Sequence, residues 1–320
     1  MSKKVQVIIN PAAGNDEPIL NTLNNAFQEC EVDWDVSITH RAGDGRRLAQ
    51  RALQDGADVV AAYGGDGTVA EVASGLVGSE VPLAILPGGT ANVMSLELGI
   101  PNTLLQAARL ACGIGSKVDR IDVGQIGSQH FLLRVAIGFE AAMVEQADRG
   151  LKDRFGVLAY LWSAMKNLLE PTIADYQFVL DGKEVECRGF TCAIANSGNL
   201  GLPGLQLSSA ISVRDGLLDV ITVEEANLRA LSEVMGRVFG VQNSTASAQG
   251  EALERYSDEI QGVLRHWQAR EISVSMTPMQ ATQYDGELLE SVQLPIQCKV
   301  MPQLLKVIVP DIGDKQPNGV

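Results

Sequence analysis

The length, composition and charge of the chain already exclude several classes of protein. Its 320 residues suffice for two domains of ordinary size, and 46% hydrophobic with 20% charged residues is the composition of a globular protein. A net charge of −14 argues against a nucleic-acid partner, because nucleic acids are bound by a basic face.

The cysteines and the N-terminal residues bear on the compartment. The five cysteines are odd in number and form no Cys-x-x-Cys pair, so neither a disulfide framework nor a zinc site is expected. Met1 to Lys4 lead directly into a strand pattern, without an apolar stretch long enough for a signal peptide or a membrane span. We therefore expect a cytoplasmic protein that is at most peripheral to a membrane during turnover.

The first two predicted strands end in polar residues at what should be one sheet edge. Apolar residues 5–9 stop at the Asn10–Gly14 turn, and a helical stretch over 17–30 follows. A second strand, over 34–39, leads through a glycine-containing loop into another helix. Carboxyl ends of parallel strands bind ligands in open α/β sheets, so we expect Thr39 and Asn10 to lie at the same edge.

The central stretch of the chain is the apolar strand 59–63, followed by Gly-Gly-Asp-Gly-Thr and a helical pattern. Glycines let the backbone take positive φ and let a bulky ligand come close, while free amides at a helix start attract an anion. The turn therefore predicts a polyphosphate ligand, and its members are Gly64, Gly65, Asp66, Gly67 and Thr68. The alternative is an ordinary strand-to-helix turn, since Gly and Asp favour turns. It is neither a P-loop nor a dinucleotide Gly-x-Gly-x-x-Gly turn.

The acid in this turn sharpens the prediction. Asp66 beside a phosphate would be repelled unless a cation, a hydroxyl or a sugar edge lay between them. A magnesium-nucleotide supplies all three. We therefore expect Asp66 to help position a magnesium-nucleotide.

A fourth strand, over 83–86, ends in a third glycine-rich turn, Pro87–Asn92, whose hydroxyl on Thr90 is in reach of a phosphate. Short strands that alternate with helices, the last of them near 103–112, predict a doubly wound, parallel α/β domain. Three of its turns carry chemistry suited to a nucleotide.

From residue 117 onward the pattern changes to strands without regular helical crossovers. This predicts a mostly antiparallel β-sandwich. We expect a nucleotide-binding α/β domain over 1–123, a β-sandwich domain over 124–309 and a tail over 310–320. The last apolar run, 304–309, is compatible with a return to either domain.

Two helical insertions interrupt these strands, over 139–169 and 226–266. The first carries Arg149, Lys152 and Arg154 ahead of an aromatic, apolar face, a pattern that favours either membrane contact or simple cover for a sheet. The polar middle of the second has the composition of a linker or a lid.

Two acidic turns remain in the second half. Asp215 begins an Asp-Gly-Leu-Leu-Asp run, where its carboxylate is free to bind a hard cation together with backbone carbonyls. Asp285-Gly286-Glu287 is a tight turn that bears two carboxylates. Taken singly, each is also an ordinary hairpin signal.

Together and in this order, these motifs resemble the diacylglycerol kinase catalytic family, and most of all its soluble bacterial-type lipid kinases. The resemblance spans nearly the whole chain. It implies a Rossmann-like nucleotide lobe followed by a β-sandwich lobe, and transfer of the γ-phosphoryl group of Mg-ATP to a lipid hydroxyl such as that of diacylglycerol.

The resemblance also implies roles for individual residues. Glu287 would be the general base that takes the proton of the lipid hydroxyl, with Asp285 beside it, and a structural Mg²⁺ would be held by the Asp215 carboxylate with the carbonyls of Ser212 and Leu217. ATP would be contacted by Thr39, by the turn from Gly65 to Glu71 and by Thr90, with Asn10 nearby.

Other interpretations stay open at this point. Many relatives carry Asp where this chain has Val93, which weakens the case for diacylglycerol itself, and a sphingoid base, phosphatidylglycerol or another alcohol remains an alternative acceptor. An NAD kinase shares the Gly-Gly-Asp-Gly turn, although its other motifs do not match. A non-catalytic nucleotide or lipid sensor is the third alternative, and a homodimer is compatible with the sequence.

Overall fold

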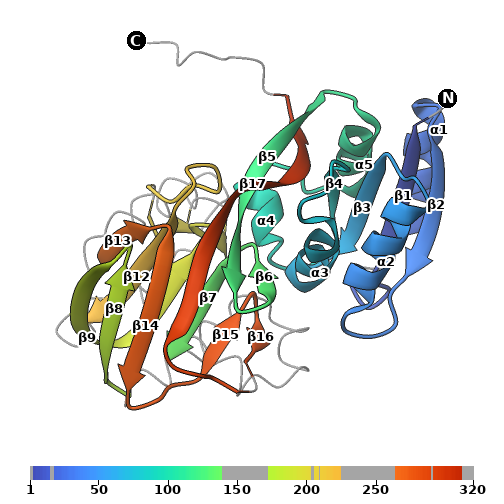
Figure 1. Cartoon of the computed structure of the whole chain (residues 1–320). Helices are drawn as coiled ribbons and strands as arrows, with labels where there is room; N and C mark the ends of the chain where they lie inside the picture. The colour runs from blue at the N-terminus through green and yellow to red at the C-terminus, as the bar shows by residue number, and fades with distance from the viewer. Residues whose placement is uncertain are drawn as a thin grey trace, which may run out of the picture. The chain divides into compact units, whose positions relative to one another are not determined.

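The fold is known from a computed structural model, which describes residues 3–14, 18–138, 172–202, 205–208, 210–224, 264–289 and 291–311. The chain divides into two compact units (Figure 1). Unit 1 comprises residues 1–121 and 303–320, and unit 2 comprises residues 122–302. The chain passes between the units along two strands, β5 (Ser116–Ile126) and β17 (Ile296–Pro310), each of which gives residues to both.

Unit 1 contains the parallel sheet that the sequence predicts. The strand order is β2-β1-β3-β4, and the second half of β17 continues it, since Val307 pairs in parallel with Leu83 of β4. The run 304–309 thus belongs to the sheet of unit 1. The strands are β1 (Lys4–Ile9), β2 (Asp33–Ile38), β3 (Val59–Gly64) and β4 (Leu83–Pro87).

Helices cover this sheet because each buries one apolar stripe. In α1 the buried residues Leu23, Ala26 and Phe27 recur at helical spacing, and the Phe27 ring meets Trp34 of β2 edge-on at 5.3 Å. Helix α1 contacts α5, whereas α2 contacts α3. The short α4, which the sequence analysis missed, follows Asn92 in the left-handed conformation. The helices are α1 (Ile19–Glu29), α2 (Asp44–Gln54), α3 (Asp66–Leu76), α4 (Val93–Glu97) and α5 (Leu104–Cys112).

Unit 2 is antiparallel, and the two-part fold predicted from the sequence is confirmed. Strand β9 connects its parts, because its first half pairs with β8 and its second half pairs with both β7 and β12. Further strands extend these pairs, β14 beside β8, β15 beside β7, and β13 beside β12. The strands are β6 (Gln129–Phe131), β7 (Arg134–Gly138), β8 (Ala174–Leu180), β9 (Lys183–Ala195), β10 (Asn199–Leu202), β11 (Leu205–Gln206), β12 (Leu218–Glu224), β13 (Arg265–Ala269), β14 (Glu271–Thr277), β15 (Thr282–Tyr284) and β16 (Glu287–Leu288).

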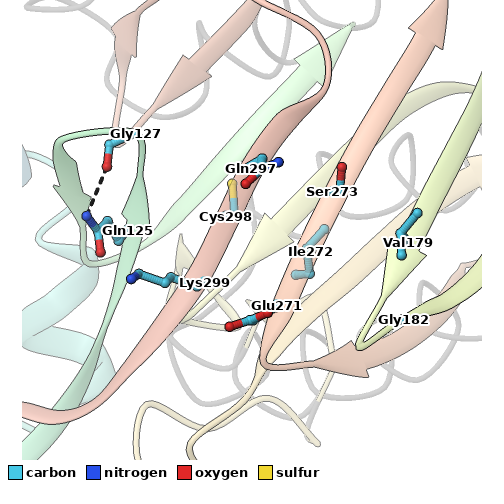
Figure 2. Close-up of a pocket in the computed structure, with 10 residues that line it drawn as sticks. All are labelled: Gln125, Gly127, Val179, Gly182, Glu271, Ile272, Ser273, Gln297, Cys298 and Lys299. Atoms are coloured by element: carbon cyan, nitrogen blue, oxygen red, sulfur yellow. Dashed lines mark hydrogen bonds between the residues drawn. The ribbon is translucent and has the colours of Figure 1, made fainter.

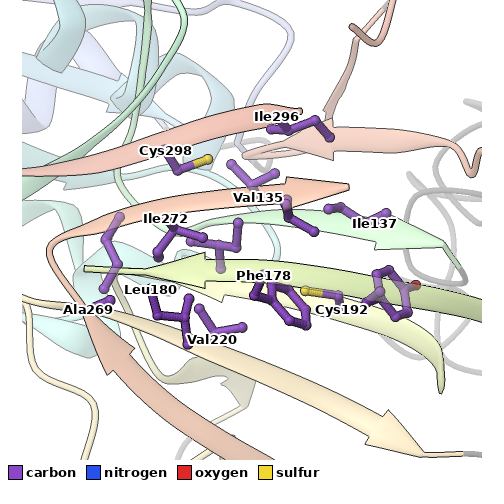
Figure 3. Packing of buried hydrophobic residues seen from close by; sticks show 14 of the residues in the cluster. Val135, Ile137, Phe178, Leu180, Cys192, Val220, Ala269, Ile272, Ile296 and Cys298 are labelled. Atoms are coloured by element: carbon purple, nitrogen blue, oxygen red, sulfur yellow. The ribbon is translucent and has the colours of Figure 1, made fainter. Parts of the chain in front are cut away.

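The strands of unit 2 enclose a large apolar core, to which alternate residues of strands such as β7, β8, β14 and β17 contribute (Figure 3). A smaller buried cluster of unit 2 comprises Ala195, Ile211 and Ile221. Strand β8 buries every second residue, so that Tyr176 and Phe178 stack at 5.9 Å inside the core. Three cysteine thiols also lie here, and burial raises the pKa of the Cys298 thiol to about 12. All five cysteines of the chain are free thiols.

Both predicted helical insertions fall largely outside the described residues. Residues 139–171, with Arg149, Lys152 and Arg154, are not described, and neither are residues 225–263. The end of the second insertion differs from the prediction, because Arg265 and His266 begin strand β13. Among the helices that the structure describes, none is long and apolar enough to cross a membrane.

Candidate functional site

The predicted nucleotide turns of unit 1 gather where the strand order reverses. Because β1 lies between β2 and β3 and all three are parallel, the turns that follow them share one edge of the sheet. Asn10 joins two of these turns, because its Nδ2 donates to Thr68 Oγ1 at 3.0 Å and its backbone amide donates to the Tyr63 carbonyl at 3.0 Å. Thr39 lies at the same edge, with its amide bonded to the Ile9 carbonyl at 2.9 Å.

Two of the glycine turns approach each other so closely that side chains are excluded. A Cβ on Gly89 would lie 2.5 Å from the Cα of Gly65, and the Gly88 amide donates to the Gly64 carbonyl at 3.0 Å. Gly67 is different, since a Cβ there would meet nothing within 4 Å. Gly67 therefore faces open space at the start of α3, where backbone amides are suited to a phosphate.

Asp66 connects the central turn to α4. Its Oδ1 accepts a hydrogen bond from the Met94 amide at 3.2 Å, so α4 contributes to the setting of this acid. The Asn92 side chain closes the turn before α4, because its Oδ1 accepts from the Gly89 amide and its Nδ2 donates to the Gly89 carbonyl, both at 2.8 Å. Thr90 is exposed on this turn.

Glu71 has both of its oxygens occupied by the backbone. They accept from the amides of Gly43 and Gly45, each at 2.8 Å, which ties α3 to the start of α2. The neighbouring Asp44 accepts from the amides of His40 and Arg41 and pairs with Arg47. The His40 amide, followed by the Arg47 guanidinium, lowers the pKa of Asp44 to about 2.

In unit 2, residues 284–287 form a two-residue hairpin between β15 and β16, here called the acid hairpin. Asp285 and Gly286 both have positive φ, 46° and 89°, as a type I′ turn requires. Glu287 is exposed, and its Oε2 accepts from the Tyr284 hydroxyl at 3.2 Å. The hairpin thus holds an exposed carboxylate next to a fixed one.

Asp285 is the fixed carboxylate of the acid hairpin. Its Oδ1 accepts from the amides of Leu133 and Arg134 at 2.9 and 3.0 Å, and its Oδ2 accepts from the Leu132 amide at 2.6 Å. Burial raises the pKa of Asp285 to about 6, against these three hydrogen bonds, which lower it. Both oxygens are used to hold residues 132–134, so the position of Asp285 is set by the strand next to it.

The second acidic turn, residues 212–217, is here called the Asp215 loop. Asp215 Oδ1 accepts from the Leu217 amide at 3.0 Å, and the Ser212 hydroxyl accepts from the Arg214 amide at 3.3 Å. Burial, together with the carboxylates of Asp219 and Asp122, raises the pKa of Asp215. A divalent cation would relieve this crowding of negative charge, so the residues present suit the predicted Mg²⁺.

The number of side-chain ligands near Asp215 limits the kind of metal site that this loop can form. In the part of the chain that the structure describes, no group of three or more His, Cys, Asp and Glu side chains is arranged to hold a metal. Asp215 would therefore bind an ion mainly with backbone carbonyls, those of Ser212 and Leu217 in the prediction.

Sequence reasoning missed three polar residues of unit 2: the buried Asp122 and Asn196, and the partly exposed His266. Asp122 and Asn196 are fully buried, and Asp122 Oδ2 accepts from the Gly216 amide at 2.7 Å. His266 Nε2 lies 2.5 Å from Oδ1 of the buried Asp219. No motif pointed to these three residues, because Asn196 follows an apolar strand and the other two lie in strands without any special spacing. Their neighbour Asp219 did belong to a motif, the Asp-Gly-Leu-Leu-Asp run.

A cavity of about 610 Å³ lies elsewhere in unit 2 (Figure 2). Residues of β5, β8, β14 and β17 line it, among them Ser273, Gln297 and Lys299. It contains no residue of either acidic turn. The cavity therefore adds nothing to the candidate site.

Two family models together cover nearly the whole chain. Residues 4–126 match the diacylglycerol kinase catalytic domain, and residues 134–309 match a domain described as the YegS C-terminal NAD kinase beta sandwich-like domain. The two matches therefore place the chain in a two-domain kinase family. The chain belongs to the diacylglycerol kinase catalytic domain family.

Individual relatives agree with this assignment. A protein of Synechocystis sp., whose name states no activity, is 30% identical over 97% of this chain and 71% of its own length. A Staphylococcus haemolyticus protein named "putative lipid kinase" is 27% identical over 82% of this chain and 80% of its own. A Bacillus anthracis crystal structure titled "putative diacylglycerol kinase" has a TM-score of 0.78 at 25% identity, covering 99% of this chain and 97% of its own.

Proposed function

We propose that the protein is an ATP-dependent lipid kinase, which transfers the γ-phosphoryl group of Mg-ATP to the hydroxyl of a lipid such as diacylglycerol. The observation that carries the proposal is the convergence of the glycine turns at the point where the strand order reverses, with Gly65 and Gly89 in backbone contact and Gly67 open. This arrangement supports phosphate binding by backbone amides. Membership in the kinase family supports phosphoryl transfer as the reaction.

On this proposal the residues of unit 1 bind the donor. The backbone amides at the start of α3 receive the phosphates, while Thr90 and Thr39 offer hydroxyls from neighbouring turns. Asp66 helps to position the magnesium-nucleotide. Asn10 and Glu71 contribute by holding the turns in place, because their polar atoms are bonded to Thr68 and to the 43–45 loop. Mg²⁺ bound with the nucleotide would neutralise charge at the phosphate oxygens.

The residues of unit 2 act on the acceptor. Glu287 takes the proton of the lipid hydroxyl while that oxygen bonds to the γ-phosphorus, and the bond from the γ-phosphorus to the bridging oxygen breaks to release ADP. Asp285 holds the hairpin that carries Glu287. Asp215, with the carbonyls of Ser212 and Leu217, would hold a structural Mg²⁺ that orders the Asp215 loop.

The test is ADP release from Mg-ATP by the purified protein. Diacylglycerol, phosphatidylglycerol and sphingosine are offered in mixed micelles, with NAD as a soluble comparator. We expect turnover with one lipid class and its loss in a Glu287→Gln variant. Full turnover in that variant would remove Glu287 from the role of base.

One rival is favoured by a specific observation. The model that matches residues 134–309 is described as NAD kinase beta sandwich-like, which makes NAD the natural soluble competitor for the acceptor. Turnover with NAD alone would replace the lipid proposal. Binding of Mg-ATP without turnover on any acceptor would instead favour a nucleotide or lipid sensor.

A further inference from the structure

We propose that Asn196 is a positioning residue that couples the acid hairpin to the Asp215 loop, so that order in one promotes order in the other. The proposal deepens the proposed function, because it rests on the roles assigned there to Glu287 and Asp215. All the residues involved belong to unit 2.

The first half of the link runs from Asn196 to the acid hairpin. Asn196 Nδ2 donates to the Leu132 carbonyl at 2.8 Å, and the Asn196 backbone amide donates to the Leu133 carbonyl at 2.8 Å. On the other side of the same segment, the Leu132 and Leu133 amides donate to Asp285. Residues 132–134 are therefore held between Asn196 and the hairpin that carries Glu287.

The second half of the link runs from Asn196 to the Asp215 loop through Asp122. The same Nδ2 of Asn196 donates to the Asp122 carbonyl at 3.1 Å. Asp122 then binds the loop at two points, because its amide donates to the Val213 carbonyl and its Oδ2 accepts from the Gly216 amide, both at 2.7 Å. A single side-chain amide thus bridges the segments that fix the two acidic turns.

The burial of Asn196 indicates that this bridge fixes geometry. Its side chain is fully buried, and Oδ1 has no hydrogen-bond partner among the residues that the structure describes, so both side-chain hydrogen bonds given above are made by Nδ2. A buried acceptor without a partner is costly and is seldom retained without a compensating role. The carbonyls of Leu132 and Asp122 also fix the orientation of the side-chain amide, because in the flipped orientation its oxygen would face two carbonyl oxygens.

The test measures amide hydrogen exchange without using kinase activity. Asn196→Asp keeps the shape and Oδ1 but replaces the donor by an oxygen that faces two carbonyls. We expect exchange to become about tenfold faster at residues 132–134, which lose the bond to the Leu132 carbonyl. We expect the same at residues 213–217, because Asp122, which holds that loop, loses its bond to Asn196. The matched control is Thr222→Val, which removes the hydroxyl of another fully buried residue of unit 2, bonded to Cys187. The control should leave exchange in both segments unchanged.

A second variant covers failure of Asn196→Asp to fold. Gly216→Ala disturbs the Asp215 loop through the positive φ of 72°, and its Cβ would meet nothing closer than Pro302 at 3.9 Å. If the link exists, exchange at residues 132–134 also rises in this variant. Exchange that rises only at residues 213–217 overturns the link, as does a change confined to one segment in Asn196→Asp.

Magnesium ions alone provide the reciprocal measurement. In the unmodified protein, Mg²⁺ should slow exchange at residues 213–217 and, through the link, at residues 132–134, and Asn196→Asp should abolish the second effect. Slowing at residues 132–134 that persists in Asn196→Asp contradicts the coupling. Absence of any effect of Mg²⁺ on exchange counts against the metal assignment in the proposed function. The coupling is then still tested by comparing exchange in the unmodified protein and in Asn196→Asp without Mg²⁺.

Discussion

The candidate residues of unit 1 and unit 2 are organised by opposite means. In unit 1 two turns can approach each other because Gly65 and Gly89 have no side chains. The phosphate binding proposed for these turns uses backbone amides. In unit 2 the turns are built from carboxylates, of which Asp285 has both oxygens bonded to amides and Glu287 is exposed. Unit 1 should therefore be sensitive to added atoms, and unit 2 to removed charge.

The largest effect is expected from removal of the exposed charge in unit 2. Glu287→Gln should lower kcat by about 10²- to 10⁴-fold, because the proposed base is lost while its shape is kept. ATP affinity should change little. ADP release measures kcat, and calorimetry measures ATP affinity. Glu184→Gln, an exposed glutamate on β9, is the matched control. Equal losses in the two variants would contradict a specific role for Glu287.

Adding one methyl group in unit 1 should have the next largest effect. The Cβ of Gly89→Ala would meet the Cα of Gly65 at 2.5 Å, so the two turns must move apart and ATP affinity should fall by about 10-fold or more. Isothermal titration with Mg-ATP measures this, alongside thermal unfolding.

Gly67→Ala sharpens the same comparison, since its Cβ has no protein neighbour within 4 Å. Alanine in a helix should raise the free energy of unfolding by up to about 1 kcal/mol, yet ATP affinity should fall if a phosphate occupies that open space. Unchanged affinity in Gly67→Ala would move the phosphate site away from the start of α3.

Glu71 tests whether unit 1 also contains a carboxylate that serves the fold. Glu71→Gln leaves one of the amides of Gly43 and Gly45 facing an NH₂ group, which should lower the free energy of unfolding by about 1–3 kcal/mol. Chemical denaturation measures the loss, with Glu31→Gln, an exposed glutamate of unit 1, as a control. A loss of ATP affinity without a loss of stability would instead support the direct ATP contact predicted from the sequence.

The smallest effect concerns pH. The folded pKa of Asp44, about 2, lies below its ordinary value of 3.8, so this carboxylate stabilises the folded state above pH 3.8. That contribution is lost as the pH falls from about 4 to about 2, because protonation removes the bonds to His40 and Arg47. Thermal unfolding of Asp44→Asn should lack this part of the acid transition, and an identical acid limb in both proteins would contradict the assignment.

Much of the fold follows from patterns that are local in the sequence. Apolar runs before glycine turns predicted β1, β3 and β4, and the alternation in β8 is visible in the printed chain. Short elements were harder, because α4 has five residues and depends on a left-handed Asn92 that no local pattern requires. The strand that begins at Arg265 is equally short, with five residues, and its first two residues were assigned to the predicted insertion.

The candidate site could be predicted only in part. Turns made of glycine and acidic residues are visible in a sequence, since few other residues fit such turns. This is why residues 64–68 and 285–287 could be singled out as candidates. The partners of these turns are distant in sequence: Asn196 reaches Leu132 and Asp122, and Glu71 reaches Gly43. One sequence without an alignment contains no signal for such pairs, because each residue looks ordinary in its own strand or helix.

Strand β17 has a consequence for the order in which the protein can be completed. Its second half supplies the last strand of unit 1, where Val307 pairs with Leu83 and Lys306 pairs with Glu80. These residues leave the ribosome only after all of unit 2 has been made, whereas β1 to β4 are made first. Unit 1 must therefore keep an unpaired edge on β4 throughout synthesis of unit 2, and this edge can pair with the wrong strand during that interval.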